Sequence, residues 1–92
     1  MIFEWDYEKN EENKKKHHIS FETAIRVFHD YYRIEIHDDR FDYGEDRYVV
    51  IGMVEQVLSV VYTERGEYTR IISARKATQA ERRKYNERKS IS

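Results

Sequence analysis

The chain has 92 residues, which suits one domain with a single modest core and is too short for two. It contains no cysteine, which excludes a disulfide framework and a thiolate metal site, and no apolar run approaches the roughly 18 residues of a membrane-spanning helix. Charged residues make up 38% of the chain, hydrophobic residues 39%, and nothing at Met1 resembles a signal peptide. We therefore expect one small, soluble, cytoplasmic domain over residues 1–92.

The first part of the chain indicates a short strand followed by two helices. The segment "IFEW" (2–5) is typical of an edge strand, and Asp6 is a suitable N-cap for a polar helix running to about Lys16. Ser20 is a suitable cap for a second helix. Its apolar residues recur at helical spacing: Phe21, Ala24, Ile25, Val27 and Phe28. An alternating strand over residues 33–37 follows.

After a polar loop at residues 37–46, the pattern predicts an antiparallel meander. Three β-rich runs at 47–54, 57–64 and 67–74 are separated by two-residue turns at 55–56 and 65–66. A turn at Arg65 and Gly66 places Glu64 opposite Glu67 and puts five further side chains on the same face of the sheet. These are Tyr62, Thr69, Ile71, Ser73 and Arg75.

The last segment indicates a helix. Thr78 and Glu81 have the spacing of a capping box, which starts a helix running to about Lys89. The sequence thus predicts an α+β fold, with two N-terminal helices and one C-terminal helix gathered around an antiparallel sheet.

Charge is unevenly distributed along the chain. Residues 65–92 hold nine of the 17 Lys and Arg but only three of the 18 Asp and Glu, a balance of +6, and residues 1–64 carry −7. A basic segment of this kind is compatible with three roles: binding the phosphates of a nucleic acid, forming a solvated helix face, or docking an acidic partner. The charge pattern alone leaves all three open.

Several residues have both a structural and a chemical interpretation. Arg70 and Arg75 either extend from a half-buried sheet or bind a phosphate through two N–H groups. Tyr85 either packs its helix or stacks on a base. His17 either caps the end of the first helix or acts as a general acid or base.

Metal and cofactor chemistry have no support in the sequence. The acidic loop lacks the alternating ligand spacing of a calcium loop, and we interpret it as a solvated connection. Its acidic residues are Asp38, Asp39, Asp42, Glu45 and Asp46. There is neither a phosphate-cradling glycine motif nor a serine-hydrolase motif. We expect no metal and no cofactor.

Taken together, the sequence resembles the BrnT family of toxins of bacterial type II toxin-antitoxin systems. The matching sequence motifs occur in the same order as in the family, over nearly the whole length of the chain. They are "FEWD" (3–6), "N..KH" (13–17), "ISFE.A" (19–24), "DRY..IG" (46–52) and "YTERG....RIISAR.AT..ER..Y" (62–85). One departure is His18, which stands where the family usually has a glycine able to form a left-handed C-cap.

The resemblance implies a RelE-like ribonuclease fold and a metal-independent endoribonuclease that inhibits translation. The RNA 2'-OH would be the nucleophile, so the enzyme would align it, move protons and stabilise phosphate charge. The implied partner is a cognate BrnA-like ribbon-helix-helix antitoxin, and the complex would bind operator DNA through that antitoxin. The alternative is a non-catalytic nucleic-acid-binding or antitoxin-binding regulatory subunit.

Two sets of residues follow as candidates. Arg70 and Arg75 would stabilise charge, and His17, Glu64 and Tyr85 would transfer protons. The candidate RNA-binding residues are Lys16, Arg65, Arg82, Arg83, Lys84 and Arg88.

Overall fold

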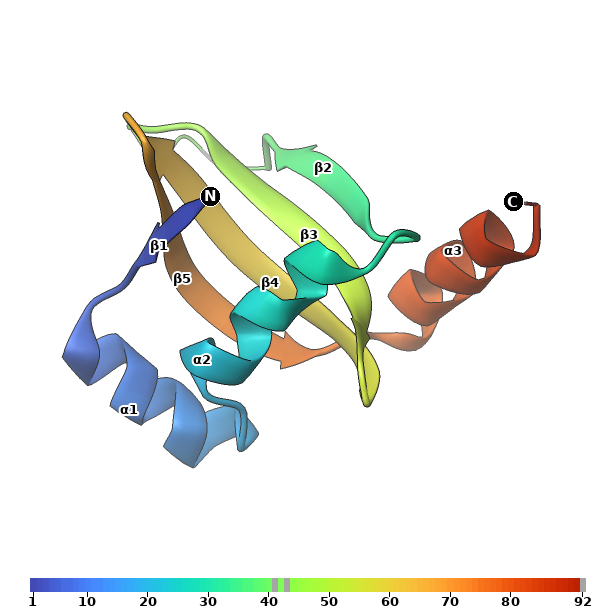
Figure 1. The fold of residues 1–92 in the computed structure, drawn as a ribbon, viewed down its shortest axis with the longest axis horizontal. Coiled ribbons are helices and arrows are strands. Elements are labelled where there is room, and N and C mark those ends of the chain that lie inside the picture. Colours follow the sequence, from blue (N-terminus) through green and yellow to red (C-terminus); the bar gives the residue numbers. More distant parts are fainter. Residues whose placement is uncertain (41, 43, 92) are drawn as a thin grey trace.

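The structure is a computed structural model that describes residues 1–40, 42 and 44–91. Phe41 and Tyr43 of the predicted loop, and Ser92 at the end of the predicted domain, lie outside the described residues. Figure 1 shows a twisted sheet with one helical segment across a face, the N-terminal helix beside its lower edge and the C-terminal helix at the opposite end. None of the helices in the described residues is long and apolar enough to cross a membrane.

The elements follow the predicted order. The strands are β1 (Ile2–Glu4), β2 (Ile34–Asp38), β3 (Arg47–Val54), β4 (Gln56–Arg65) and β5 (Tyr68–Lys76). The helices are α1 (Tyr7–His17), α2 (Phe21–Ala24), the 3-10 helix η1 (Ile25–His29) and α3 (Gln79–Ser90). The side chains of Asp6, Ser20 and Thr78 accept backbone N–H bonds as predicted. The second helix is shorter than its spacing suggested, because it changes to 3-10 geometry after Ala24.

The sheet is mixed, which corrects the prediction of an antiparallel one. Its strand order is β1-β5-β4-β3-β2, and the β3–β4–β5 meander and the β2–β3 pair are antiparallel. β1 instead runs parallel to β5, with Ile2 opposite Tyr68. No turn joins these two strands, so nothing in the three residues of β1 could indicate its direction.

The two hairpin turns differ from the prediction by one residue. Arg65 pairs with Tyr68, so Gly66 and Glu67 form the β4–β5 turn in place of Arg65 and Gly66. Gly66 has a φ of +60°, which glycine adopts at little cost. At the β3–β4 turn a single residue, Glu55, lies between the paired residues of the two strands.

A β-bulge in β5 decides which face carries the arginine at its end. Tyr62 pairs with Ile71 while Val61 pairs with Ser73, so Ile72 is an extra residue. The alternation of side chains shifts at this point. Ser73 and Arg75 therefore lie on the face opposite Ile71, and the predicted shared face was wrong for these two residues.

Two cores result from this arrangement. The larger one lies between the sheet and the segment formed by α2 and η1. Its fully buried residues include Phe21, Ala24, Val27, Val50 and Val60. The smaller core lies on the other face, where Tyr85 of α3 packs against Ile51 and Val57. α3 covers only one end of this second face, and the rest of it carries the groove described next.

Candidate active site

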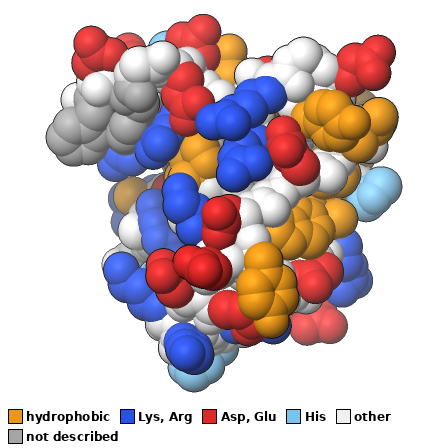
Figure 2. All heavy atoms as spheres, turned by 90° about the vertical axis from the view of Figure 1, so that its left-hand side faces the viewer, with side chains coloured by type: hydrophobic (Ala, Val, Ile, Leu, Met, Phe, Trp, Pro, Cys, Tyr) orange, Lys and Arg blue, Asp and Glu red, His pale blue; other side chains and the backbone are white. Residues whose placement is uncertain are grey.

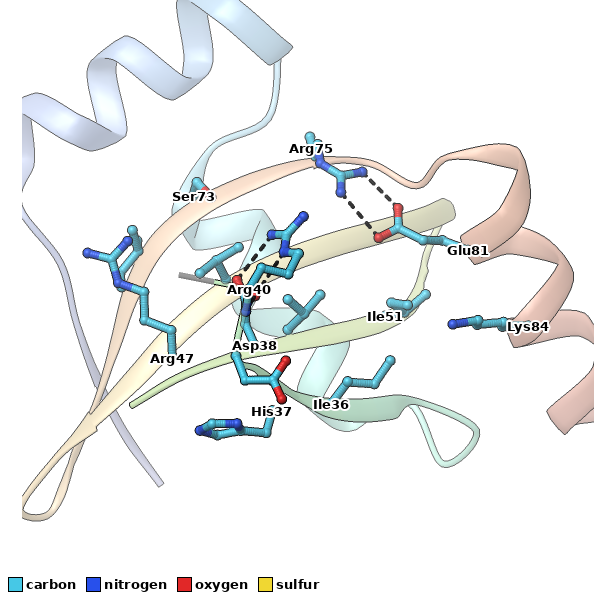
Figure 3. Close-up of a pocket in the computed structure, with 14 residues that line it drawn as sticks. Ile36, His37, Asp38, Arg40, Arg47, Ile51, Ser73, Arg75, Glu81 and Lys84 are labelled. Carbon is cyan, nitrogen blue, oxygen red and sulfur yellow. Dashed lines mark hydrogen bonds and ion pairs between the residues drawn. The ribbon is translucent and has the colours of Figure 1, made fainter. Parts of the chain in front are cut away.

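A groove of about 540 Å³ lies on the second face of the sheet, between β2, β5 and the start of α3 (Figure 3). Its floor is apolar and consists of side chains from four strands: Ile36, Val49, Ile51, Val61 and Ile72. Charged side chains surround this floor: Asp38, Asp39, Arg40, Arg47, Arg75, Glu81 and Lys84. An apolar floor with a charged rim suits a ligand that has both flat apolar rings and negative charge.

Arg75 and Glu81 form a two-point ion pair in the groove. The two carboxylate oxygens of Glu81 face the guanidinium of Arg75 fork to fork, with N···O distances of 2.7 and 3.2 Å. Arg75 also donates to the Lys76 carbonyl at 3.2 Å. These contacts use three of the five N–H donors, which leaves two without a recorded acceptor among the described residues.

Glu81 is held in place by the start of α3. It accepts from the backbone N–H of Thr78 at 2.8 Å as part of the capping box, and from the hydroxyl of Ser59 at 3.1 Å. Ser59 is the residue of β4 that pairs with Arg75. Burial disfavours the charged carboxylate, but the hydrogen bonds from Arg75, Thr78 and Ser59 outweigh it, so the pKa of Glu81 lies below its ordinary value. Glu81 is therefore an ionised group that fixes the orientation of Arg75.

Three further cations reach the groove from other elements. Arg40, two residues after β2, pairs with the buried carboxylate of Asp38 at 2.9 and 3.1 Å. Arg47, at the start of β3, pairs with Glu45 at 3.3 Å. Lys84 extends from α3 toward the groove (Figure 3). The groove thus combines positive side chains from β3, β5, α3 and the segment after β2.

His17 lies beside the groove. It is the last residue of α1, and it lines a smaller cavity of about 240 Å³ together with Ile72 and Ser73. Ile72 and Ser73 also line the groove, so the two cavities are adjacent. Partial burial, followed by the charges of Lys16, Arg75 and His18, lowers the pKa of the His17 imidazole below its ordinary value. A neutral imidazole at neutral pH is the form that can accept a proton.

His18 retains the geometry that a glycine would provide. It is the C-cap of α1, with φ 60° and ψ 29°, and its N–H donates to the Lys14 carbonyl at 2.9 Å. A left-handed conformation is strained for a residue with a Cβ atom. The C-terminal end of α1, which carries His17, therefore keeps its left-handed cap although residue 18 is histidine and not glycine.

Two candidates, Glu64 and Arg70, lie away from the groove. Glu64 is exposed near the β4–β5 turn and pairs with Thr69 on the opposite face from Arg75. Arg70 bridges to Glu4 of β1 at 3.2 Å and is directly across from Thr63. The structure therefore places His17 in a cavity adjacent to the groove that holds Arg75, and places Glu64 and Arg70 elsewhere.

Tyr85 is a buried packing residue in this structure. Its side chain is 1% exposed, and its hydroxyl donates to Asp30 Oδ2 at 2.5 Å. Burial and the neighbouring Asp30 carboxylate raise the pKa of Tyr85, which keeps the phenol protonated. This geometry gives Tyr85 a role in holding α3, and proton transfer by Tyr85 stays a prediction without geometric support.

The remaining candidate RNA-binding residues are spread over the surface. Arg82, Arg83 and Arg88 are exposed on α3, and Lys16 is exposed beside His17. Arg65 bridges to Glu45 at 3.4 Å. Seen from the side of α1 and β1, basic and acidic side chains are interspersed (Figure 2).

Arg40 and Arg47 are groove residues that the sequence analysis did not single out. For Arg47 a signal exists, because alternation in β3 places it on the same face as Val49 and Ile51. For Arg40 the sequence offers none, since it follows a strand end and its direction depends on the ion pair with Asp38. Among the described residues there is no group of three or more His, Asp or Glu side chains placed to hold a metal ion.

The fold and the site define a small α+β protein whose mixed sheet carries an arginine-lined groove beside a histidine. Residues 5–81 match the family described as "Ribonuclease toxin, BrnT, of type II toxin-antitoxin system". The chain therefore belongs to the BrnT family, which confirms the resemblance of the sequence.

A solved structure supports the fold. The chain is similar to the Brucella abortus ribonuclease toxin BrnT, known from a 1.1 Å crystal structure, with a TM-score of 0.65 and 24% sequence identity. The similarity covers 86% of this chain and 100% of the Brucella chain. A comparison with curated protein sequences gave no match.

Proposed function

We propose that this protein is the toxin of a type II toxin-antitoxin system and that it cleaves RNA at the groove. The observation that carries the proposal is the adjacency of His17 to the end of β5, where Glu81 orients Arg75. The family description as a ribonuclease toxin supports the same class of activity.

In the proposed reaction the RNA supplies its own nucleophile. Neutral His17 accepts the proton of a 2'-OH, whose oxygen attacks the adjacent phosphorus as the bond to the 5' oxygen breaks. The leaving 5' oxygen takes a proton from water, and the hydroxide that remains takes the proton of the His17 imidazolium, which restores the neutral base. The products are a 2',3'-cyclic phosphate and a 5'-OH end.

Arg75 would meet the charge that develops on the phosphoryl oxygens. Its two N–H donors that lack a recorded acceptor are available, while Glu81 holds the guanidinium at a fixed angle. Arg40, Arg47 and Lys84 would hold flanking phosphates, and the apolar floor would contact bases or ribose. None of these steps requires a metal ion.

We infer the remaining properties from the family. The partner would be a cognate ribbon-helix-helix antitoxin resembling BrnA, which would bind operator DNA in the complex. Cleavage of cellular RNA would inhibit translation in the cytoplasm. A neighbouring gene for a small ribbon-helix-helix protein would support this assignment.

The test uses purified, antitoxin-free protein and a single-stranded RNA in EDTA. We expect cleavage, with fragments that end in 2',3'-cyclic phosphate. Intact RNA, measured with protein that circular dichroism shows to be folded, would contradict the proposal and favour a non-catalytic binding subunit. Fragments that end in 3'-OH would contradict the 2'-OH mechanism.

A further inference from the structure

Asn13 of α1 pairs with the edge of β5 in the place of a missing strand. β1 pairs only with residues 68–70 of β5, so it does not reach the backbone groups of Ala74. Asn13 Oδ1 accepts from the Ala74 N–H at 3.1 Å, and Asn13 Nδ2 donates to the Ala74 carbonyl at 2.9 Å. A carboxamide has the same donor and acceptor as a peptide group, so it completes the pairing of β5 at this residue.

Burial and one further hydrogen bond also hold the Asn13 side chain in place. It is 7% exposed, and its Nδ2 also donates to the Ile19 carbonyl at 2.8 Å, in the segment that follows α1. All these bonds are buried. The carboxamide therefore has a single well-defined position between α1 and β5.

The pairing of Asn13 with Ala74, which we call the clamp, lies between His17 and Arg75, the two groups of the proposed site. Ala74 lies between Ser73 and Arg75, two residues after the bulge residue Ile72. His17 is four residues after Asn13 and thus on the same face of α1, and both line the cavity shared with Ser73. α1 and β5 are joined here, one element carrying the imidazole and the other the guanidinium.

We propose that Asn13 is a positioning residue, which sets the placement of His17 relative to Arg75 by pairing with the backbone of Ala74. For its effect on cleavage this inference rests on the proposed function. Displacement of a reacting group by about 1 Å is enough to lower a rate about 10²-fold, so a small movement of α1 would be measurable.

Asn10 provides a matched control on the same helix. It is 4% exposed and lies three residues before Asn13. Its side chain accepts from the Phe21 N–H at 2.8 Å and donates to Glu22 at 2.8 Å. It therefore joins α1 to α2, and within the part of the chain that the structure describes it makes no hydrogen bond to β5. Its loss should cost stability in a similar way without moving His17 relative to Arg75.

The experiment compares Asn13→Ala, Asn13→Asp and Asn10→Ala in the full chain, using two readouts. The first is the single-turnover rate of RNA cleavage at saturating RNA. The second is the pKa of His17, followed by NMR. Asn13→Asp keeps the size and the acceptor but turns a second oxygen toward the Ala74 carbonyl.

We expect both Asn13 variants to lower the rate about 10²-fold and to raise the pKa of His17 toward its ordinary value, because the imidazole becomes less buried and moves away from Arg75. Asn10→Ala should leave both readouts within about twofold of wild type, since the pairing with Ala74 is intact. Wild-type rate and pKa in the folded Asn13 variants would overturn the inference. Failure of both Asn13 variants to fold would also overturn it, because Asn13 would then be a folding residue only.

The two readouts separate this inference from the proposed function. If the pKa of His17 rises in the Asn13 variants while wild-type protein leaves RNA intact, the clamp is supported and the proposed function fails. If Arg75→Lys abolishes cleavage but the Asn13 variants cleave at the wild-type rate and leave the pKa of His17 unchanged, the proposed function is supported and the clamp is contradicted.

Discussion

Tyr85 and Asp30 join α3 to the body of the protein through one short hydrogen bond. The Tyr85 hydroxyl donates to Asp30 Oδ2 at 2.5 Å, and the same carboxylate accepts from the backbone N–H groups of Met53 and Tyr32. Asp30 follows η1, at the turn that leads into β2. This one carboxylate therefore connects α3 with the ends of two other elements.

Tyr85→Phe should lower the free energy of unfolding by about 2 kcal/mol, because the half-buried, charged carboxylate of Asp30 loses a hydrogen bond. The single-turnover cleavage rate should stay within about threefold of wild type, since Tyr85 does not line the groove. Urea denaturation and single-turnover assays at 25 °C check both values. A large loss of rate with unchanged stability would return Tyr85 to the catalytic set.

His18→Gly should stabilise the protein. His18 is in the left-handed region at φ 60°, where a side chain costs about 1 kcal/mol that glycine avoids. The matched control is Lys15→Gly, in the last turn of α1, which should instead lower stability by about 1 kcal/mol. Thermal unfolding of the two variants gives the sign of each change. Destabilisation by His18→Gly would show that the imidazole makes a compensating contact.

The pH dependence of cleavage should report His17. Because the pKa of His17 is lowered in the folded protein, the neutral base persists below the ordinary histidine pKa of about 6.5. The acid limb of the pH–rate profile should therefore lie below pH 6.5, and Arg75→Ala should move it upward by removing a positive charge. An acid limb at or above pH 6.5 would argue against His17 as the base.

The same shift has a consequence for stability. The unfolded chain protonates its histidine first as the pH falls through about 6.5, so it binds more protons than the folded state. Stability should therefore decrease on acidification from that pH down to the lowered pKa of His17. His17→Ala should remove this component of the acid-side loss, measured by urea denaturation between pH 7.5 and 5.

Much of the fold could be predicted because local signals and tertiary structure agree. The caps Asp6, Ser20 and Thr78 indicate the helix starts, and the β-rich runs separated by short turns indicate β3 and β4. The direction of β1 could not be predicted, because it depends on where a three-residue segment lies after the chain has folded. The same holds for the bulge at Ile72, which depends on pairing with β4.

The bulge also explains what the sequence reveals about the site. Strict alternation places Arg75 on the face of Ile71, and only the extra residue moves it into the groove with Arg47. The grouping of His17 with Arg75 likewise depends on the packing of α1 against β5, through Asn13. Residue types suggested Arg75 and His17 as candidates, but tertiary contacts decide that these two, and not Glu64, lie together.

Replacing Arg75 by lysine separates the charge of this side chain from its geometry, because lysine keeps the charge and loses the planar fork. We predict that Arg75→Lys lowers the single-turnover cleavage rate at saturating RNA by about 10²-fold with little change in RNA binding. The matched change Arg83→Lys, on the exposed side of α3, should leave the rate unchanged. Cleavage at the wild-type rate by folded Arg75→Lys protein would contradict the assignment of the groove as the active site.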